Sequence, residues 1–211
     1  QLGWDNFLEV FRNFGSGGPR AEVSVAVPRA IALNLGVVSA GALVSGIRND
    51  ARLNTVSGDI IVDTLIGDLT VNSVSGDVQV RGLTGSISAN SVSGDVAVTG
   101  AIRKATVDIV SGATLVDAAG DVNTINVNSV SGGTTVRLDE SLAANYVIRS
   151  LSGRLLIDGV ERSSSGPSNY TGSTGELAGR FVDLPANSVS GGVTVLRRTP
   201  ATITEDAEWE S

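Results

Sequence analysis

The stretch "NSVSGDV" occupies residues 72–78 and returns unchanged at residues 90–96. Close variants stand elsewhere in the chain, among them "NTVSGDI" at 54–60 and "NSVSGGV" at 187–193. An internal repeat of this kind indicates one structural unit that stacks on copies of itself. Counted from the aliphatic residue before each Ser, the copies begin at Val38, Val56, Val74, Val92, Val110, Val130, Leu151 and Val189. The first four intervals are each eighteen residues, and we call one such repeat a rung.

Apolar residues alternate with polar ones inside each rung, which predicts short strands with every second side chain turned inward. The helical spacing of i, i+3, i+4 and i+7 is absent from the repeat. The residues predicted to point inward are Ala42, Ile60, Val78 and Val96; Val44, Val62, Val80, Val98 and Val116; Ile47, Leu65, Leu83 and Ala101; and the pairs Ala51/Leu53, Leu69/Val71, Ile87/Ala89 and Ala105/Val107. The sequence therefore predicts an all-β fold, a single-stranded parallel β-solenoid (β-helix) of about eighteen residues per rung.

The number of rungs follows from the copies. Eight copies of the repeated phrase carry a Ser directly after the aliphatic residue. The long interval between Leu151 and Val189 fits two rungs if "YTG", which begins at Tyr170, stands in the place of a further copy. We therefore expect eight or nine rungs.

The repeated polar residues predict shape rather than chemistry. Gly permits the positive φ of a sharp corner, Ser can bond the backbone freed by that turn, and stacked Asn side chains can bond from rung to rung. A nucleophilic Ser is the functional alternative, but the chain has no His to activate it. The predicted structural columns are Ser57, Ser75 and Ser93; Gly58, Gly76 and Gly94; and Asn54, Asn72 and Asn90.

Acidic residues that follow the corner Gly form a further column, Asp59, Asp77 and Asp95. Stacked carboxylates repel one another, and a bound cation would relieve that repulsion. The paired glycines of the calcium-binding nonapeptide repeat are missing, so solvated corner acids are the preferred interpretation and these three residues are weak metal candidates only.

The composition excludes several classes of function. The chain has 211 residues, a formal net charge of −7 and no clustered basic residues, which argues against nucleic-acid binding. It contains no His and no Cys, which removes the commonest general base and metal ligands. We therefore predict no catalytic residues, no cofactor and no enzymatic activity.

The two ends differ from the repeat. Residues 1–20 hold "WDNFLEVFRNF" at 4–14, whose apolar residues have helical spacing, followed by a Gly-rich joint. This segment predicts a cap on the open solenoid end or, alternatively, a partner-binding or membrane-surface helix. Residues 21–27 alternate like a strand and begin the solenoid domain, predicted over residues 21–198 with a mobile polar loop at 162–179. Residues 199–211 form an acidic tail, and no apolar run reaches the length of a membrane helix.

The recurring "VSGD[IV]xV" and "GDLTV", preceded by "VAVP" at residues 25–28, resemble a bacterial β-strand-repeat family that carries the label adhesin. The resemblance covers residues 21–198 and implies a β-solenoid of actinobacteria and firmicutes, with some members tied to the cell envelope. It supplies no catalytic or ligand-binding residues.

Three functions remain open on these grounds. The first is a non-enzymatic scaffold or binding module at the cell envelope, with a repetitive protein or polysaccharide as partner. The second is a structural protein that self-associates through its solenoid ends, as bactofilins do. The third is a carbohydrate-active β-helix enzyme, which would need a pair of acids or an Asp with an Arg in a groove.

Overall fold

The protein is described by a computed structural model at residues 24–162, 167–175 and 181–198. Within these ranges the chain forms strands and turns, no helix, and so no helix that could cross a membrane. The predicted cap at residues 4–14 and the tail lie outside the described residues.

Sixteen strands join in one continuous sheet that winds into a rod. In chain order they are β1 (Leu33–Ser39), β2 (Ala42–Ile47), β3 (Ala51–Ser57), β4 (Ile60–Ile66), β5 (Leu69–Ser75), β6 (Val78–Ser93), β7 (Val96–Ser111), β8 (Thr114–Ala118), β9 (Thr124–Ser131), β10 (Thr134–Asp139), β11 (Ala143–Ser152), β12 (Leu155–Ile157), β13 (Val160–Glu161), β14 (Ser168–Thr174), β15 (Phe181–Ser190) and β16 (Val193–Arg198).

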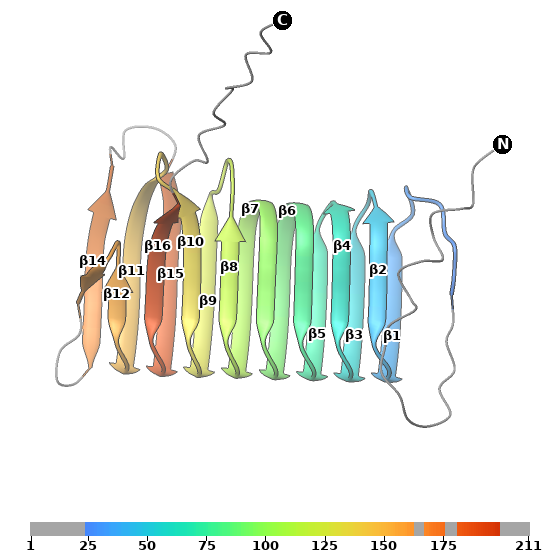
Figure 1. Ribbon diagram of the computed structural model, residues 1–211, viewed down its shortest axis with the longest axis horizontal. Coiled ribbons are helices and arrows are strands. Elements are labelled where there is room, and N and C mark those ends of the chain that lie inside the picture. Colours follow the sequence, from blue (N-terminus) through green and yellow to red (C-terminus); the bar gives the residue numbers. More distant parts are fainter. Residues whose placement is uncertain (1–23, 163–166, 176–180, 199–211) are drawn as a thin grey trace, which may run out of the picture.

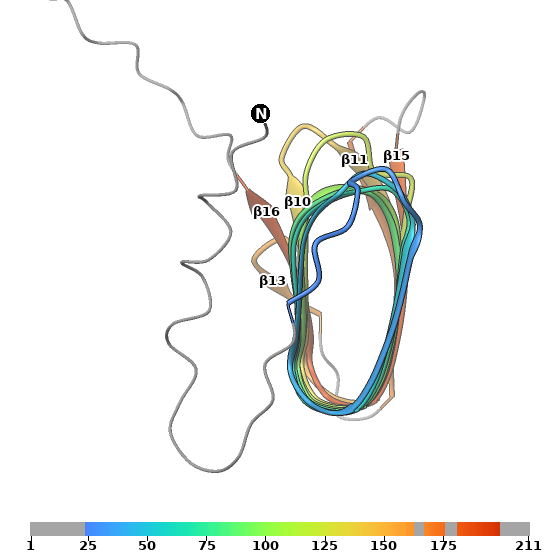
Figure 2. The ribbon, with the colours of Figure 1, turned by 90° about the vertical axis from the view of Figure 1, so that its right-hand side faces the viewer.

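The rungs lie side by side along the rod (Figure 1), and viewed along the axis they superimpose as a flattened oval with two long walls (Figure 2). The first wall precedes the Ser-Gly corner and holds β1, β3, β5, the second halves of β6 and β7, β9, β15 and β11. The second wall follows that corner and holds β2, β4, the first halves of β6 and β7, β8, β10, β16 and β12.

Neighbouring rungs pair in parallel, with equivalent residues side by side. Asn54 pairs with Asn72, and Asn72 with Asn90. Val62, Val80, Val98 and Val116 are each 0 % exposed and stack in the interior. These observations confirm the predicted all-β parallel β-solenoid.

One predicted inward residue was wrong: Ala101 is exposed and Ile102 takes its place in the core. The physical reason is a missing glycine. Gly85 turns the upper corner of its rung with φ 147°, but Arg103 stands eighteen residues later. Gly100 turns instead, with φ 153°, and the register between β6 and β7 shifts before it.

The last rungs do not stack in the order of the sequence. The rung of β15 and β16 lies between the rung of β9 and β10 and that of β11 and β12, although it follows both in sequence. The eight corner copies therefore stack in the order Val38, Val56, Val74, Val92, Val110, Val130, Val189 and Leu151.

Tyr170 does not begin a further rung. It lies in β14, which pairs antiparallel with β11 and places Tyr170 opposite Ile148. Residues 168–174 are therefore a strand, and the prediction of a mobile loop over 162–179 was wrong for this part. β13 pairs antiparallel with β12, so antiparallel strands close both walls at this end of the rod.

At the opposite end, β1 and β2 form the first rung. Residues 24–27, the described part of the predicted strand at 21–27, are exposed and form no strand, so that prediction was wrong here. The turn at residues 28–31 reaches the first upper corner, where the Arg48 amide donates to the Arg29 carbonyl at 2.7 Å.

Replacing Val80 by Asp tests the core. The carboxylate would be buried among apolar side chains without a partner, so we expect a loss of about 4 kcal/mol or more of unfolding free energy in urea titrations. Arg81→Asp is the control, because Arg81 is the exposed next residue of the same strand. Equal stability of the two variants would contradict the assigned register.

Candidate functional site

The lower corner holds Ala40 in the first rung and glycine in the other seven, and two features favour glycine there. Gly76 has φ 122°, in the region that side chains disfavour. A Cβ on Gly76 would also lie 2.7 Å from the carbonyl carbon of Gly58 on the neighbouring rung. Gly58 and Gly94 have φ values of 124° and 117° and the same close approach to the preceding rung. The glycine column is therefore set by stacking as well as by the turn.

Two serines of the repeated phrase occupy different places. Ser57, Ser75 and Ser93, which precede the glycines, are exposed. The Ser before the aliphatic residue is buried, and its hydroxyl faces the corner carbonyl: Ser73 Oγ lies 3.5 Å from Gly76 O, and Ser188 Oγ lies 3.1 Å from Gly191 O. The hydroxyls next to the corner backbone thus come from the first Ser of "NSVSG".

The asparagines form a hydrogen-bonded column on the outside of the first wall. Asn72 Nδ2 donates to Asn54 Oδ1 at 2.8 Å, and Asn90 Nδ2 donates to Asn72 Oδ1 at 2.9 Å. Asp108 interrupts the amides, and Asn128 Nδ2 donates to its carboxylate at 2.6 Å. Each amide in the column keeps one N–H and one lone pair that these bonds do not use.

The aspartates after the corner are exposed, but their carboxylates bond to the backbone. Asp59 Oδ1 accepts from the Asp77 amide at 3.0 Å, Asp77 Oδ1 from the Asp95 amide at 2.9 Å, and Asp95 Oδ1 from the Ala113 amide at 2.7 Å. The described residues include no group of His, Cys, Asp and Glu that could hold a metal ion. The column thus caps backbone amides from rung to rung.

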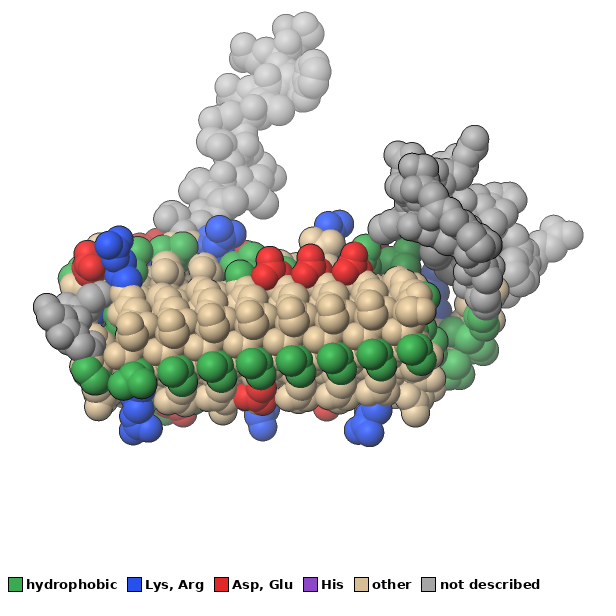
Figure 3. Space-filling model, turned by 90° about the horizontal axis from the view of Figure 1, so that it is seen from below, with side chains coloured by type: hydrophobic (Ala, Val, Ile, Leu, Met, Phe, Trp, Pro, Cys, Tyr) green, Lys and Arg blue, Asp and Glu red, His purple; other side chains and the backbone are tan. Residues whose placement is uncertain are grey.

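A row of aliphatic side chains runs along the lower edge of the rod (Figure 3). Its members, between 46 % and 72 % exposed, are Val38, Val56, Val74, Val92, Val110, Val130, Val189 and Leu151. This aliphatic column is unusual because side chains of this size are most often buried.

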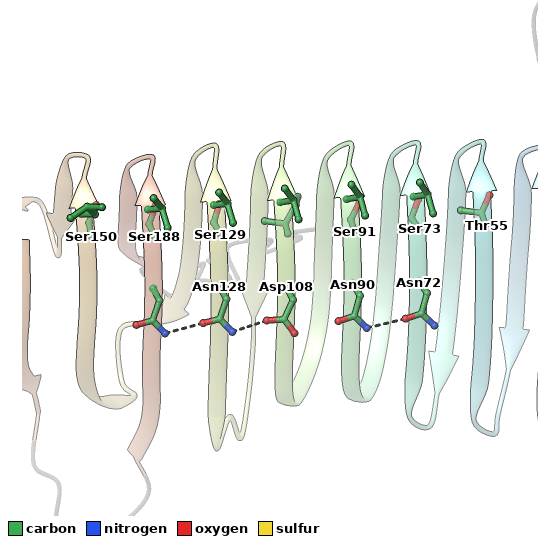
Figure 4. A pocket seen from close by; sticks show the side chains of 18 of the residues that line it. Thr55, Asn72, Ser73, Asn90, Ser91, Asp108, Asn128, Ser129, Ser150 and Ser188 are labelled. Carbon is green, nitrogen blue, oxygen red and sulfur yellow. Dashed lines mark hydrogen bonds between the residues drawn. The ribbon is translucent and has the colours of Figure 1, made fainter. Parts of the chain in front are cut away.

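A shallow groove of about 1030 Å³ follows the rod between the aliphatic column and the asparagine column. Its floor is the buried residue between the two, such as Ser73 or Ser91 (Figure 4). Among the residues that the structure describes, two charged ones line it, Asp108 and Arg149. The groove is therefore long, periodic and nearly neutral.

A second polar feature, the C-terminal clasp, consists of Asp117, Asp139, Tyr146, Asp158, Arg197 and Arg198, and it does not repeat. Arg197 and Arg198 end β16. Arg198 bonds to Asp139 Oδ1 at 2.6 Å and to Asp117 Oδ1 at 2.9 Å, both on the second wall.

Arg197 faces the other way in the clasp. Its Nε lies 3.3 Å from Asp158 Oδ1, its Nη1 donates to the Leu142 carbonyl at 2.6 Å, and its Nη2 donates to the Tyr146 hydroxyl. Tyr146 is 0 % exposed, and its hydroxyl donates to Asp158 Oδ2 at 3.1 Å. No repeated pattern marks these residues, so the sequence did not reveal them.

Contacts within the clasp shift the pKa values of two of its acidic groups, Asp139 and Tyr146. Burial would raise the pKa of Asp139, but hydrogen bonds from Arg198 and the Gly120 amide, with the charge of Arg198, outweigh it and hold that pKa below the ordinary value. Burial raises the pKa of Tyr146 above its ordinary value. At neutral pH the clasp therefore holds an ionised Asp139 beside Arg198 and a neutral Tyr146 phenol.

The fold and its periodic groove define a parallel β-solenoid repeat domain. Residues 44–102 match the protein-family model described as Toastrack DUF4097, which covers under a third of the chain. No curated protein and no solved structure matches the chain.

Replacing Asp77 tests the capping role of the aspartate column. Asp77→Ala leaves the Asp95 amide without its acceptor and should cost about 1 kcal/mol in urea unfolding. Asp77→Asn keeps an acceptor oxygen and removes a charge, so its stability should stay close to wild type. A melting temperature of the wild type that rises with millimolar Ca²⁺, and does not rise in Asp77→Asn, would instead indicate a cation site.

Asp139→Asn tests the clasp through pH. Because the folded pKa is lowered, the stabilisation by Asp139 is present above the ordinary pKa near 3.8 and is lost as the pH falls through the lowered value. Relative to wild type, Asp139→Asn should lose about 1 kcal/mol at pH 7 and much less near pH 3. A difference that does not change with pH would argue against an ionic contribution.

Proposed function

We propose that the chain is a non-enzymatic scaffold and binding module whose groove holds an extended polymer, a polysaccharide or an unfolded protein segment, along the rod. The observation that carries this proposal is the straight groove between the asparagine and aliphatic columns. Amides with unused hydrogen-bonding capacity on one side and methyl groups on the other offer the same contacts at the five rungs that carry Asn, namely those of Asn54, Asn72, Asn90, Asn128 and Asn187.

A periodic surface favours a periodic partner. Each rung offers a weak contact, and a polymer that spans several rungs makes many of them at once, which raises the overall affinity. The near absence of charge in the groove favours a neutral chain over a strongly anionic one.

The absence of catalysis is part of this proposal. Within the described ranges, Asp117, Asp139 and Asp158 of the clasp bond to Arg197 or Arg198. Glu161, which does not repeat either, pairs with Arg154 at 3.2 Å. Carboxylates held in such pairs are poorly suited to act as general acids near neutral pH. A location at the bacterial cell envelope rests on the adhesin-type resemblance and is tested separately, by locating the full-length protein in fractionated cells.

Head-to-tail filaments, the alternative function, are disfavoured by one end of the rod. β14 and β13 cover the parallel edges of β11 and β12 with antiparallel strands, so a second copy cannot continue the parallel stacking there. Filaments in electron micrographs of the purified protein would reverse this ranking.

The test measures binding to a panel of neutral and acidic cell-wall polysaccharides and extended peptides, beside an assay for cleavage. For a polymer that binds, Val74→Lys and then Val74→Lys with Val92→Lys should weaken affinity stepwise, by about fivefold for each lost aliphatic contact of about 1 kcal/mol. Ile61→Lys is the matched control, because Ile61 is a partly exposed aliphatic residue of the second wall outside the groove.

Two results would contradict the proposal. One is affinity that falls equally in the control and in the groove variants. The other is cleavage of a polysaccharide that a single carboxylate substitution abolishes.

A further inference from the structure

The hydrogen bonds of the asparagine column all run in one direction. Each amide donates through Nδ2 to the neighbouring rung that lies nearer to β1: Asn72 to Asn54 at 2.8 Å, Asn90 to Asn72 at 2.9 Å and Asn187 to Asn128 at 2.9 Å. A member inside the column therefore accepts from one neighbour and donates to the other. An amide can do both, because it carries an acceptor oxygen and donor N–H groups.

Asp108 interrupts this direction. Its Oδ1 accepts from Asn128 Nδ2 at 2.6 Å, as an asparagine at that place would. On the other side Asp108 lies beside Asn90, whose Oδ1 needs a donor, and a carboxylate has no donor to offer. Figure 4 shows the two side chains next to each other with no bond drawn between them. Within the part of the chain that the structure describes, no donor bonds to Asn90 Oδ1 or Asp108 Oδ2, so two acceptors meet in the groove.

Two neighbouring acceptors, one of them charged, favour a cationic hydrogen-bond donor. The arginines that form ion pairs among the described residues pair with other acids. A bare Ca²⁺ ion is poorly suited, because it takes about six to eight oxygen ligands. An ammonium or guanidinium group of a bound molecule would bond to both oxygens at once and form a charge-assisted bond with the carboxylate.

The same column holds a charge of the opposite sign, Arg149. Along the rod Asp108 is followed by Asn128, Asn187 and then Arg149. Arg149 is exposed and makes none of the ion pairs found among the described residues. Three rungs of about 4.8 Å separate the two charges by about 14 Å, and an extended peptide of about 3.3 Å per residue covers that distance in about four residues.

The aliphatic column favours one of the two polymers in the proposed function. Among the described residues that line the groove there is no aromatic ring. Sugar rings pack best through their C–H faces on aromatic rings. Aliphatic side chains and the alkyl stems of Lys and Arg pack well on valine methyl groups. The groove therefore fits a polypeptide better than a polysaccharide.

We propose that the groove binds an extended protein segment, with a Lys or Arg side chain between Asn90 and Asp108 and an acidic side chain at Arg149. The inference rests on the proposed function, because it uses the same groove, and it names the class of polymer and its two anchors. The contacts with the aliphatic and amide columns repeat from rung to rung, whereas these two charges do not. They therefore fix the position of the segment along the rod.

The test measures binding of labelled peptides to the full chain by fluorescence anisotropy. The peptides have about twelve residues, chiefly Thr, Ser and Val, which in extended form span the eight rungs. One peptide carries a Lys and, four residues away, a Glu, and it is made in both sequence orders. Its partner has Gln in place of the Lys. The wild type should bind the better of the two Lys peptides at least about tenfold more tightly than its Gln partner, as expected for a hydrogen bond to a charged group.

Asp108→Asn should abolish the preference for Lys over Gln. Asp63→Asn is the matched control, because Asp63 is an exposed aspartate of β4 outside the groove, and it should keep the preference. Arg149→Gln should weaken binding of the Glu peptide and leave a peptide with Gln in place of the Glu unaffected. Without any peptide, Asp108→Asn should raise the urea midpoint, because an asparagine there can donate to Asn90 and accept from Asn128.

Three results would overturn the inference, and they differ from failure of the proposed function. One is equal affinity for the Lys and Gln peptides while Val74→Lys still weakens both, which would leave the groove as a binding site without the charged anchors. Another is binding of chitosan, a polymer of amino sugars, that needs Asp108 while no peptide binds. The third is a lower urea midpoint for Asp108→Asn than for the wild type. Binding of neither peptides nor polysaccharides would instead contradict the proposed function itself.

Discussion

Parallel pairing between equivalent residues is the constraint on which the rest of this protein depends. Once Asn54 pairs with Asn72 and Asn72 with Asn90, every position of the repeat becomes a column along the rod. Inward columns become the core, and outward columns become ladders of one chemistry. The corner must be glycine because a side chain there would strike the neighbouring rung's backbone. The groove follows from the same constraint, since it lies between two such columns.

Much of this could be predicted from sequence because the information is local and repeated. Alternation placed Val62 and Val80 inside, and eighteen-residue spacing predicted parallel stacking. The exchange of Ala101 for Ile102 depended on a glycine missing from a single rung, which a period averaged over many copies hides. The exposed aliphatic column was not recognised as a surface, because hydrophobicity alone does not show which side of a corner a side chain takes.

The order of the last rungs was beyond prediction for a different reason. The repeated phrase gives β15 the same parallel register on β9 and on β11, so the repeat itself does not show that β15 lies between them. The contacts that accompany the observed order involve segments outside the repeat, such as β14 on the outer edge of β11, and residues far apart in the chain, such as Arg198 with Asp139 and Asp117. These charged residues do not belong to the repeat, so the spacing of the repeat does not predict that they pair. The asparagine column of the groove could thus be predicted from the repeat, whereas the groove itself and the clasp became visible only in three dimensions.

The rung of β15 and β16 lies between two other rungs, so a mechanical pull on the two ends of the chain meets different resistance. A pull on the chain before β1 acts on a rung that has one parallel neighbour. The rungs can therefore detach from that end one after another. A pull on the chain after β16 meets a rung that is bonded on both faces, to β10 and to β12. That rung must break two ladders together, with the bonds of Arg197 and Arg198, before it moves. Force applied from the C-terminal side therefore meets the more resistant end of the molecule.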